Sequence, residues 1–363
     1  MISFADYLQL LPKAELHCHF VSVMRPARLI DLAAKNDVSL KSTDVDDLLD
    51  YDNLIDFLDV FNAGHEVLVS PDDFATVAYE GVLDAVESGN LKYREYYVNP
   101  FNFVSRGISY QTLIDSISQG LEQAESDFGV GFRIIPAINR SHSAQSAVEL
   151  VELIAAHPHE KVVGIGMDDL TPEGFEEPLR FREAYELAGE RGLKRTAHAG
   201  ETLAASAQNV IDAIETLGCD RVDHGYRIVD DQALLQRALD SGVPFACTPL
   251  STRVLSGWAF DDQHRIARMV RAGLPVSLST DDAVFFRTDI GLEYTAALPA
   301  MGFTAAEASQ IALAGIEAAW CSPEEKARLL ADAAAGIRAL DALLDIPTLH
   351  IPTLHIPTKE STT

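Results

Sequence analysis

The chain has 363 residues, 47% of them hydrophobic, and 55 acidic against 28 basic side chains give a formal net charge of −27. This charge argues against a nucleic-acid partner, and the absence of a long apolar run argues against a membrane span. Four cysteines without CxxC spacing, and a start without signal-peptide features, predict a cytoplasmic protein.

Short β-rich runs alternate with amphipathic helical stretches along most of the chain. The expected strands are 14–19, 91–98, 132–138, 162–167, 194–198, 221–224, 243–247 and 275–280. The clearest helical stretches between them are 143–156, 178–191, 230–241 and 262–272. Strands that each precede a helix predict an α/β fold, a (β/α)8 TIM-type barrel.

The segment between the first two strands is unusually long and predicts extra helices, at 53–63 and 72–87, that cap the barrel mouth. Residues 1–345 are expected to form a single barrel domain that ends in a helix over 323–344. The remaining residues, 346–363, repeat the unit IPTLH. Proline in each unit blocks a helix, so an extended or disordered tail is expected, and its histidines are poor site candidates.

The motif ELHCHF contains His17 and His19, which face the same way if this stretch is a strand. By itself the pair is weak evidence of a metal site. Further histidines and carboxylates follow at the ends of the fifth, sixth and eighth strands, in HAGE, DHGY and STDD. Because the active sites of such barrels gather at the C-terminal ends of the strands, these groups are expected to meet.

Three imidazoles and one carboxylate suit zinc and leave a position for water, which ionises near neutral pH when it is bound. A further histidine or carboxylate can orient that water. Glu201, just beyond a ligand, is placed to move protons to a substrate. The alternative for each residue alone is an ordinary hydrogen-bonded polar side chain at a strand end.

The stretches PKAELHCH, HAGE, DHGYR and STDDA resemble the signature motifs of the adenosine/adenine deaminase family of the amidohydrolase superfamily. The resemblance runs from Leu11 to Leu340. Within the family, NLIDFLDVFNAG, EYYVNPFNFVSRG and VVGIGMDDL are more similar to the adenine deaminase branch. The implied activity is hydrolytic deamination at C6 of adenine or an adenine-containing small molecule, with release of ammonia.

The resemblance implies one Zn²⁺ per chain, held by His17, His19, His198 and Asp281. It further implies that His224 orients the attacking water and that Asp281 shares its proton. Glu201 would protonate N1 of the purine ring, and Asp282 would hydrogen-bond N7.

Departures from the family pattern bear on the substrate. Val21 cannot accept a hydrogen bond from a ribose hydroxyl, as the acid usual near this position does in the adenosine branch. In GMDDLT, Asp168 and Asp169 are candidate substrate contacts, with a solvated loop as the alternative, and Arg253 is a third candidate. Gly166 either lets a flat base approach the backbone or relieves crowding in the strand.

Three functional classes remain open at this stage. The first is a zinc aminohydrolase of adenine, with adenosine or an N6- or 5′-substituted adenine derivative as alternatives. The second is amide or ester hydrolysis by a binuclear relative, which usually needs a modified lysine at the end of the fourth strand, whereas Lys161 lies at its start. The third, a non-catalytic binding protein, has no need for Glu201. A homo-oligomer is possible.

Two other residues near the motifs are expected to be structural. Cys18 lies between the two histidines of ELHCHF, on the opposite strand face, and is predicted to pack behind the barrel. His264 opens the helical stretch after the seventh strand and is predicted to have a structural role.

Overall fold

The computed structural model describes residues 1–51 and 54–344. Its strands pair in parallel, in the orders β1 to β5 and β6 to β9. The bounds are β1 Lys13–His19, β2 Leu91–Val98, β3 Gly131–Asn139, β4 Gly164–Asp168, β5 Lys194–Arg195, β6 His198–Ala199, β7 Val222–His224, β8 Phe245–Cys247 and β9 Val276–Leu278. Because β5 and β6 are two parts of the predicted fifth strand, these segments correspond to the predicted eight.

Backbone hydrogen bonds close the ring of strands. Beside the break between β5 and β6, the Thr196 N–H donates to the carbonyl of Ile165, 3.0 Å away. On the other side of the ring, the His19 N–H donates to the carbonyl of Asp281 at 3.0 Å, and the Asp281 N–H donates to that of His17 at 3.1 Å. The first and last strands therefore meet, and the predicted (β/α)8 barrel is confirmed.

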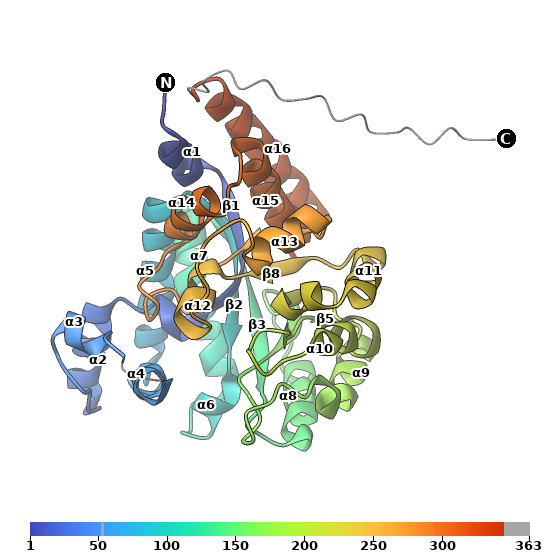
Figure 1. Cartoon of the computed structure of the whole chain (residues 1–363). Coiled ribbons are helices and arrows are strands. Elements are labelled where there is room, and N and C mark those ends of the chain that lie inside the picture. Colours follow the sequence, from blue (N-terminus) through green and yellow to red (C-terminus); the bar gives the residue numbers. More distant parts are fainter. Residues whose placement is uncertain (52–53, 345–363) are drawn as a thin grey trace.

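Helices surround the strands on the outside of the barrel (Figure 1). The α-helices are α1 Phe4–Leu10, α2 Pro26–Asn36, α3 Val45–Leu48, α4 Leu54–Glu66, α5 Pro71–Gly89, α6 Pro100–Val104, α7 Tyr110–Phe128, α8 Ala144–Ala156, α9 Arg182–Glu190, α10 Ala207–Ile211, α11 Gln232–Ser241, α12 Pro249–Leu255, α13 Arg265–Ala272, α14 Ile290–Ala300, α15 Ala305–Ala318 and α16 Pro323–Asp341. Short turns of other helix types are η1 Phe20–Val23, η2 Pro178–Phe181, η3 Asp212–Thr216 and η4 Tyr226–Asp230. None of the helices in the described ranges is long and apolar enough to span a bilayer.

The extra helices between the first two strands are present as α2 to α5, and α2, α3 and α4 lie together at one side of the barrel (Figure 1). Local sequence explains the bounds of α5. Ser70 and Asp73 form a capping box, Pro71 occupies the first turn, and Asn90 ends the helix with a φ of 54°. The predicted helix at 53–63 is α4, and residue 53 itself lies outside the described residues.

Some predicted elements are shorter or divided in the structure. The stretch predicted as one helix at 178–191 is a short 3₁₀ turn, η2, followed by α9. The last helix begins at Pro323 as predicted, where Ser322 Oγ accepts the Glu325 N–H, and it ends at Asp341. The predicted tail, 346–363, lies outside the described residues, so the proposed division between barrel and tail stays a prediction.

Candidate active site

Four barrel strands bring histidines and one aspartate together at their C-terminal ends. The side-chain ligand atoms of His17, His198, His224 and Asp281 all lie within 4.8 Å of one another, and all four residues are buried. His19, two residues after His17 on β1, joins Asp281 and Asp282 in a second such group. The sequence-predicted ligands therefore converge, as the barrel topology required.

Asp281 is the centre of this cluster. Its Oδ1 atom lies 3.0 Å from His17 Nε2 and 3.3 Å from His19 Nε2. Its other oxygen, Oδ2, accepts a hydrogen bond from Ser251 Oγ at 2.7 Å. Both carboxylate oxygens are thus fixed by side chains from β1 and from the start of α12.

The backbone at two of the strand ends adopts the left-handed region. His224 has a φ of 66° and Asp281 a φ of 65°, conformations that residues other than glycine rarely adopt. Each costs about 1–3 kcal/mol and persists only where the surrounding structure enforces it. At both positions the chain leaves its strand, so the side chain no longer follows the alternation of the strand behind it.

Asp223 lies behind the cluster, on the side of His17 that faces away from Asp281. Its Oδ1 atom is 3.3 Å from His17 Nδ1, and Oδ2 accepts hydrogen bonds from the Tyr97 hydroxyl and, at 2.6 Å, from Thr196 Oγ1. Burial alone would raise the pKa of Asp223, but His17 and Arg221 hold that pKa well below its usual range. A carboxylate there orients the imidazole of His17.

The donor set fits a divalent metal. The Asp223 carboxylate, 3.3 Å from Nδ1 of His17, favours the proton of the neutral ring on that nitrogen, which leaves the lone pair on Nε2, the atom 3.0 Å from Asp281. Nδ1 of His198 and Nε2 of His224 are buried and have no hydrogen-bond partner among the described residues. Converging imidazole nitrogens and a carboxylate oxygen need a cation between them.

The electrostatics of His17 agree with this fit. Burial opposes a charge on the ring, but Asp223 and Asp281 outweigh that effect and raise the pKa of His17 to about 10. Burial and the neighbouring histidines instead hold the pKa of His198 well below its usual range. The cluster as a whole therefore favours one positive charge near Asp281, which a proton or a metal ion can supply.

Glu201 follows β6 and faces His224. Its Oε2 atom lies 3.8 Å from His224 Nε2, and its side chain is 20% exposed. Burial, together with the nearby carboxylates of Asp281 and Glu176, raises the pKa of Glu201 to about 8. The carboxyl group is therefore protonated at neutral pH and can donate a proton.

The other ring nitrogen of His224, Nδ1, lies beside two hydroxyl groups. Nδ1 lies 3.2 Å from the Tyr226 hydroxyl and 3.3 Å from Thr248 Oγ1. Burial lowers the pKa of His224 to about 3, so its ring is neutral. A neutral imidazole with Nε2 open toward Glu201 can exchange a hydrogen bond with a water molecule or a substrate atom.

Two further carboxylates border the cluster. Asp282 accepts a hydrogen bond from Ser22 Oγ. Asp168 accepts two from the Asn99 amide, at 2.8 and 2.9 Å, and lies 3.7 Å from His19 Nδ1. Burial raises the pKa of each to about 6. Both can therefore take part in proton-sharing contacts with a polar ligand.

Two predicted substrate contacts have other surroundings. Asp169 is exposed, and its carboxylate accepts a hydrogen bond from the Asn139 amide at 2.9 Å. A Cβ atom on Gly166 would lie 2.3 Å from the ring of Tyr97, so this glycine makes room for that ring. Neither residue is brought against the cluster, and their roles toward a substrate stay predictions.

An aromatic layer covers the cluster from the side of α4. The Phe61 ring lies 6.3 Å from the His19 ring and 6.0 Å from the Phe285 ring, centre to centre. Val21 packs beneath this layer: a Cβ atom on Gly64 would approach Val21 Cγ1 to 3.1 Å and Phe285 to 3.2 Å. Val21, two positions after His19, is thus part of an apolar contact with α4.

His264 and Cys18, both expected to be structural, have structural contacts, and the substrate role of Arg253 stays a prediction. His264 Nδ1 accepts the Ile266 N–H, and Nε2 lies 3.0 Å from Thr252 Oγ1. Arg253 is exposed, with its guanidinium 5.8 Å from the Phe260 ring centre. Cys18 is fully buried, as predicted for the opposite strand face.

The lysine required by the binuclear alternative is not at the cluster. Lys161 precedes β4, and its ammonium pairs with Glu125 Oε2 at 2.9 Å. The end of β4 carries Asp168 in that place. The residues present therefore fit the mononuclear arrangement better than a lysine-bridged pair of metals.

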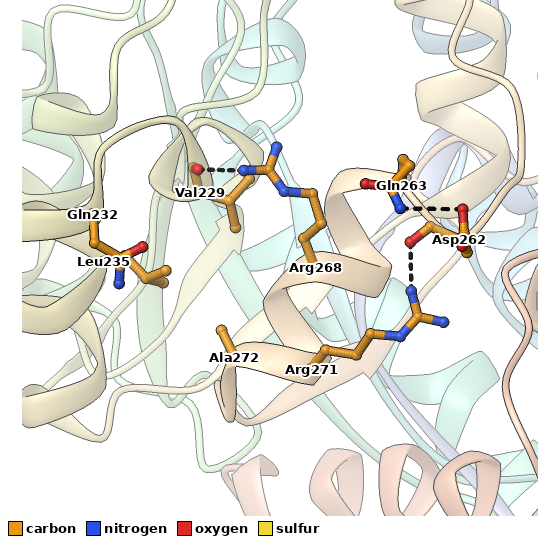
Figure 2. A pocket seen from close by; sticks show the side chains of 8 residues that line it. All are labelled: Val229, Gln232, Leu235, Asp262, Gln263, Arg268, Arg271 and Ala272. Carbon is orange, nitrogen blue, oxygen red and sulfur yellow. Dashed lines mark hydrogen bonds between the residues drawn. The ribbon is translucent and has the colours of Figure 1, made fainter.

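A separate hollow of about 350 Å³ lies on the outside of the barrel, between η4, α11 and α13 (Figure 2). Its arginines are already engaged: Arg268 donates to the carbonyl of Val229 at 2.7 Å, and Arg271 donates to that of Asp262. It contains none of the sequence-predicted site residues. The lining residues are Val229, Gln232, Leu235, Asp262, Gln263, Arg268, Arg271 and Ala272.

Sequence reasoning gave no role to four residues that support the cluster. In a regular strand, neighbouring residues face opposite ways, so Asp223 is expected to point away from the cluster that contains His224. The left-handed φ of His224 breaks this alternation, and nothing in the sequence pattern reveals it. Glu176 lies in a loop without periodicity. Tyr97 lies in EYYVNPFNFVSRG and Asp223 in DHGYR, while Ser251 lies after the seventh strand and in none of these motifs; only tertiary structure shows the partners of all three. The four are Tyr97, Glu176, Asp223 and Ser251.

Comparison with known proteins agrees with this geometry. An adenine deaminase of Cupriavidus pinatubonensis is 33% identical over 334 residues, which cover 91% of this chain and 93% of that protein. A zinc-bound amidohydrolase from Burkholderia ambifaria superposes with a TM-score of 0.86 at 31% identity, over 94% of this chain and 95% of the other. The N6-methyl-AMP deaminase of Arabidopsis thaliana superposes with a TM-score of 0.78 at 25% identity, over 91% and 98%.

The model of the adenosine deaminase family matches residues 12–335, which includes every strand of the barrel and each histidine and aspartate of the candidate metal cluster. The sequence motifs, the converging ligands and this match agree, and the chain belongs to the adenosine deaminase family.

Proposed function

We propose that this protein hydrolytically deaminates adenine at C6 and releases ammonia. As a member of the family it is a metal-dependent purine aminohydrolase; the free base as substrate is our proposal. The observation that carries the proposal is the position of Glu201, whose Oε2 atom lies 3.8 Å from His224 Nε2 beside the cluster; burial and neighbouring carboxylates also raise its pKa to about 8. A proton donor beside a hydrolytic centre is what ring protonation during deamination requires.

We assign one zinc ion per chain to His17, His19, His198 and Asp281. Zinc bound there would supply a water molecule that ionises near pH 7. His224 has a ligand atom near the same point, yet its Nδ1 is held by Tyr226 and Thr248, and its Nε2 is the atom nearest to Glu201. We therefore assign His224 to orientation of the attacking water rather than to the metal.

The remaining roles follow from where protons are held. Glu201 donates its proton to N1 of the ring, which makes C6 more electrophilic. His224 orients the attacking water, and Asp281 shares its proton. Asp282 hydrogen-bonds N7, and Asp168, which is fixed by Asn99, is a second candidate contact. The water oxygen bonds to C6, and the proton taken from the water passes to the amino group, which leaves as ammonia when the C6–N bond breaks. The C6 hydroxyl returns its remaining proton to Glu201, so that C6 carries a carbonyl oxygen.

Free adenine is favoured over adenosine by the apolar surroundings of Val21. This residue is 4% exposed and lies beside Gly64, which also adjoins Phe285, and its side chain offers no acceptor for a ribose hydroxyl. A buried hydroxyl without a partner costs about 1–3 kcal/mol, roughly one to two orders of magnitude in kcat/KM. An N6-substituted adenine remains the second candidate, supported by the likeness to the N6-methyl-AMP deaminase.

Ammonia release from adenine, adenosine, adenylate and N6-methyladenine tests the proposal. The last substrate would release methylamine, so that amine is measured beside ammonia. We expect adenine to give the highest kcat/KM and adenosine to be at least about tenfold poorer. A tenfold preference for adenosine over adenine would contradict the substrate assignment. A protein that acts on none of these purines would contradict the proposed function.

A further inference from the structure

The turn that carries Glu201 is held by a second glutamate from a different loop. Glu176 lies in the segment between β4 and η2 and is 2% exposed. Its Oε1 atom accepts the Glu201 N–H at 2.9 Å and the Thr202 N–H at 3.4 Å. Its Oε2 atom accepts the Gly200 N–H at 2.7 Å and the Asn209 amide at 2.8 Å.

Three successive backbone N–H groups thus point at one carboxylate. The chain reaches this arrangement because Gly200 has a φ of 68°, which turns its N–H and the next two to the same side. A side chain at Gly200 would also meet Val210 Cγ2 at 2.6 Å, so the turn has little freedom to take another shape. The carboxylate of Glu176 completes a preformed anion cradle.

The loop that carries Glu176 is itself fixed. The Thr171 N–H donates to the carbonyl of Phe175 at 2.9 Å, and Thr171 Oγ1 accepts the Phe175 N–H at 3.2 Å. Pro178 then starts η2 directly after the loop. The carboxylate therefore has a rigid backbone behind it and can act as an anchor for the turn that it binds.

We infer that Glu176 is a positioning residue for deamination: by holding the backbone of residues 200–202, it aims the Glu201 side chain at the reacting ring. This inference rests on the proposed function. Glu176 touches neither the cluster nor the substrate in this assignment, so its effect passes through Glu201. A displacement of about 1 Å at a reacting group can lower a rate about 100-fold.

Glu176→Gln tests the inference, because the amide keeps the size of the side chain but places an N–H₂ group against the backbone donors. We expect kcat to fall about 10- to 100-fold with KM nearly unchanged and the metal content full. Glu173→Gln is the matched control, since Glu173 is an exposed glutamate on the same loop, and it should leave kcat unchanged.

A double-mutant cycle separates positioning from a general structural role. In the Glu201→Gln background, Glu176→Gln should cost less than about twofold, because the group through which it acts is already gone. An equal loss in both backgrounds, loss of metal from the Glu176 variant, or a normal kcat in that variant would overturn the inference.

Two further outcomes are decisive. If Glu176→Gln does not fold, Glu176→Asp takes its place in the same cycle, and failure of both to fold would overturn a positioning role in favour of a purely structural one. A wild-type protein that is inactive on every purine would overturn the proposed function together with the inference. An active wild type with a normal Glu176 variant would overturn the inference alone.

Discussion

Nδ1 of His17 lies 3.3 Å from Oδ1 of Asp223, while Nε2 of the same ring lies 3.0 Å from Asp281. The imidazole is thus held between two carboxylates, one behind it and one in the metal-type cluster. Asp223 is in turn held by Tyr97 and Thr196. This series of contacts fixes both the tautomer and the orientation of the His17 ring.

Asp223→Asn should weaken metal binding about 10- to 100-fold, because the amide no longer provides a charged acceptor for the His17 N–H. Competition of the apoprotein with a chromogenic chelator for zinc measures the affinity directly, without any activity assay. Asp240→Asn, an exposed aspartate on α11, is the matched control and should bind like the wild type. Unchanged affinity in Asp223→Asn would show that the contact does not tune the ligand.

His19→Ala should remove most of the metal and the activity. Nε2 of His19 is 3.3 Å from Asp281 Oδ1, so its loss takes one of the four assigned ligands away. Metal content per chain is measured by elemental analysis after gel filtration, with His142→Ala, outside the cluster, as control. A His19→Ala protein with full metal would contradict the assignment of His19.

The activity should depend on pH through Glu201. With its pKa raised to about 8, the group holds its proton at pH 7 and loses it as the pH rises further. Because the protonated form is the donor, kcat/KM should fall above about pH 8, by about tenfold for each pH unit. Glu201→Gln should keep the metal and lose about 10²- to 10⁴-fold in kcat. An alkaline fall that persists in the residual activity of this variant would belong to another group.

Gly64→Ala should destabilise the cap over the cluster. The added methyl group would lie 3.1 Å from Val21 Cγ1 and 3.2 Å from the Phe285 ring, so these buried side chains must move by a few tenths of an ångström. Overpacking of this kind costs about 1–3 kcal/mol in the free energy of unfolding. Gly336→Ala in α16 is the control, since its nearest neighbour is 3.7 Å away, and it should be neutral or slightly stabilising. Equal stability of the two variants in urea would contradict a tight cap.

The sequence allowed the barrel and the cluster to be predicted because both depend on simple periodicities. His17 and His19 follow the two-residue repeat of a strand, and the remaining histidines close strands whose C-terminal ends must meet. Strand bounds were less accurate in the second half of the barrel. There the fifth strand is divided into β5 and β6, and β7 to β9 are three residues each; β7 ends at His224, whose left-handed φ of 66° the sequence does not reveal.

The supporting residues could not be predicted in the same way. Asp223 reaches His17 from a strand more than two hundred residues away, and Glu176 reaches Glu201 from a loop with no repeating pattern. Such contacts are set by tertiary packing and by the left-handed φ of Gly200 and His224. Asp169, whose role toward a substrate stays a prediction, shows how little sequence proximity alone fixes. It adjoins Asp168 in sequence, yet its φ of 61° turns the chain at that point, and its side chain is exposed.

The backbone pairing between β1 and the segment after β9 has a consequence for the folding of the protein during synthesis. His17 and Asp281 are 264 residues apart in the chain, and both contribute to the metal-type cluster. A metal held by both fastens the first strand to the last, and a link that closes so long a loop restricts the unfolded chain strongly. During synthesis, the candidate metal cluster cannot be complete until most of the chain has left the ribosome, because Asp281 follows His17 by 264 residues. A metal ion bound by both residues would therefore join the two ends of the barrel late in folding, and its removal should destabilise the contact between β1 and the segment after β9 first.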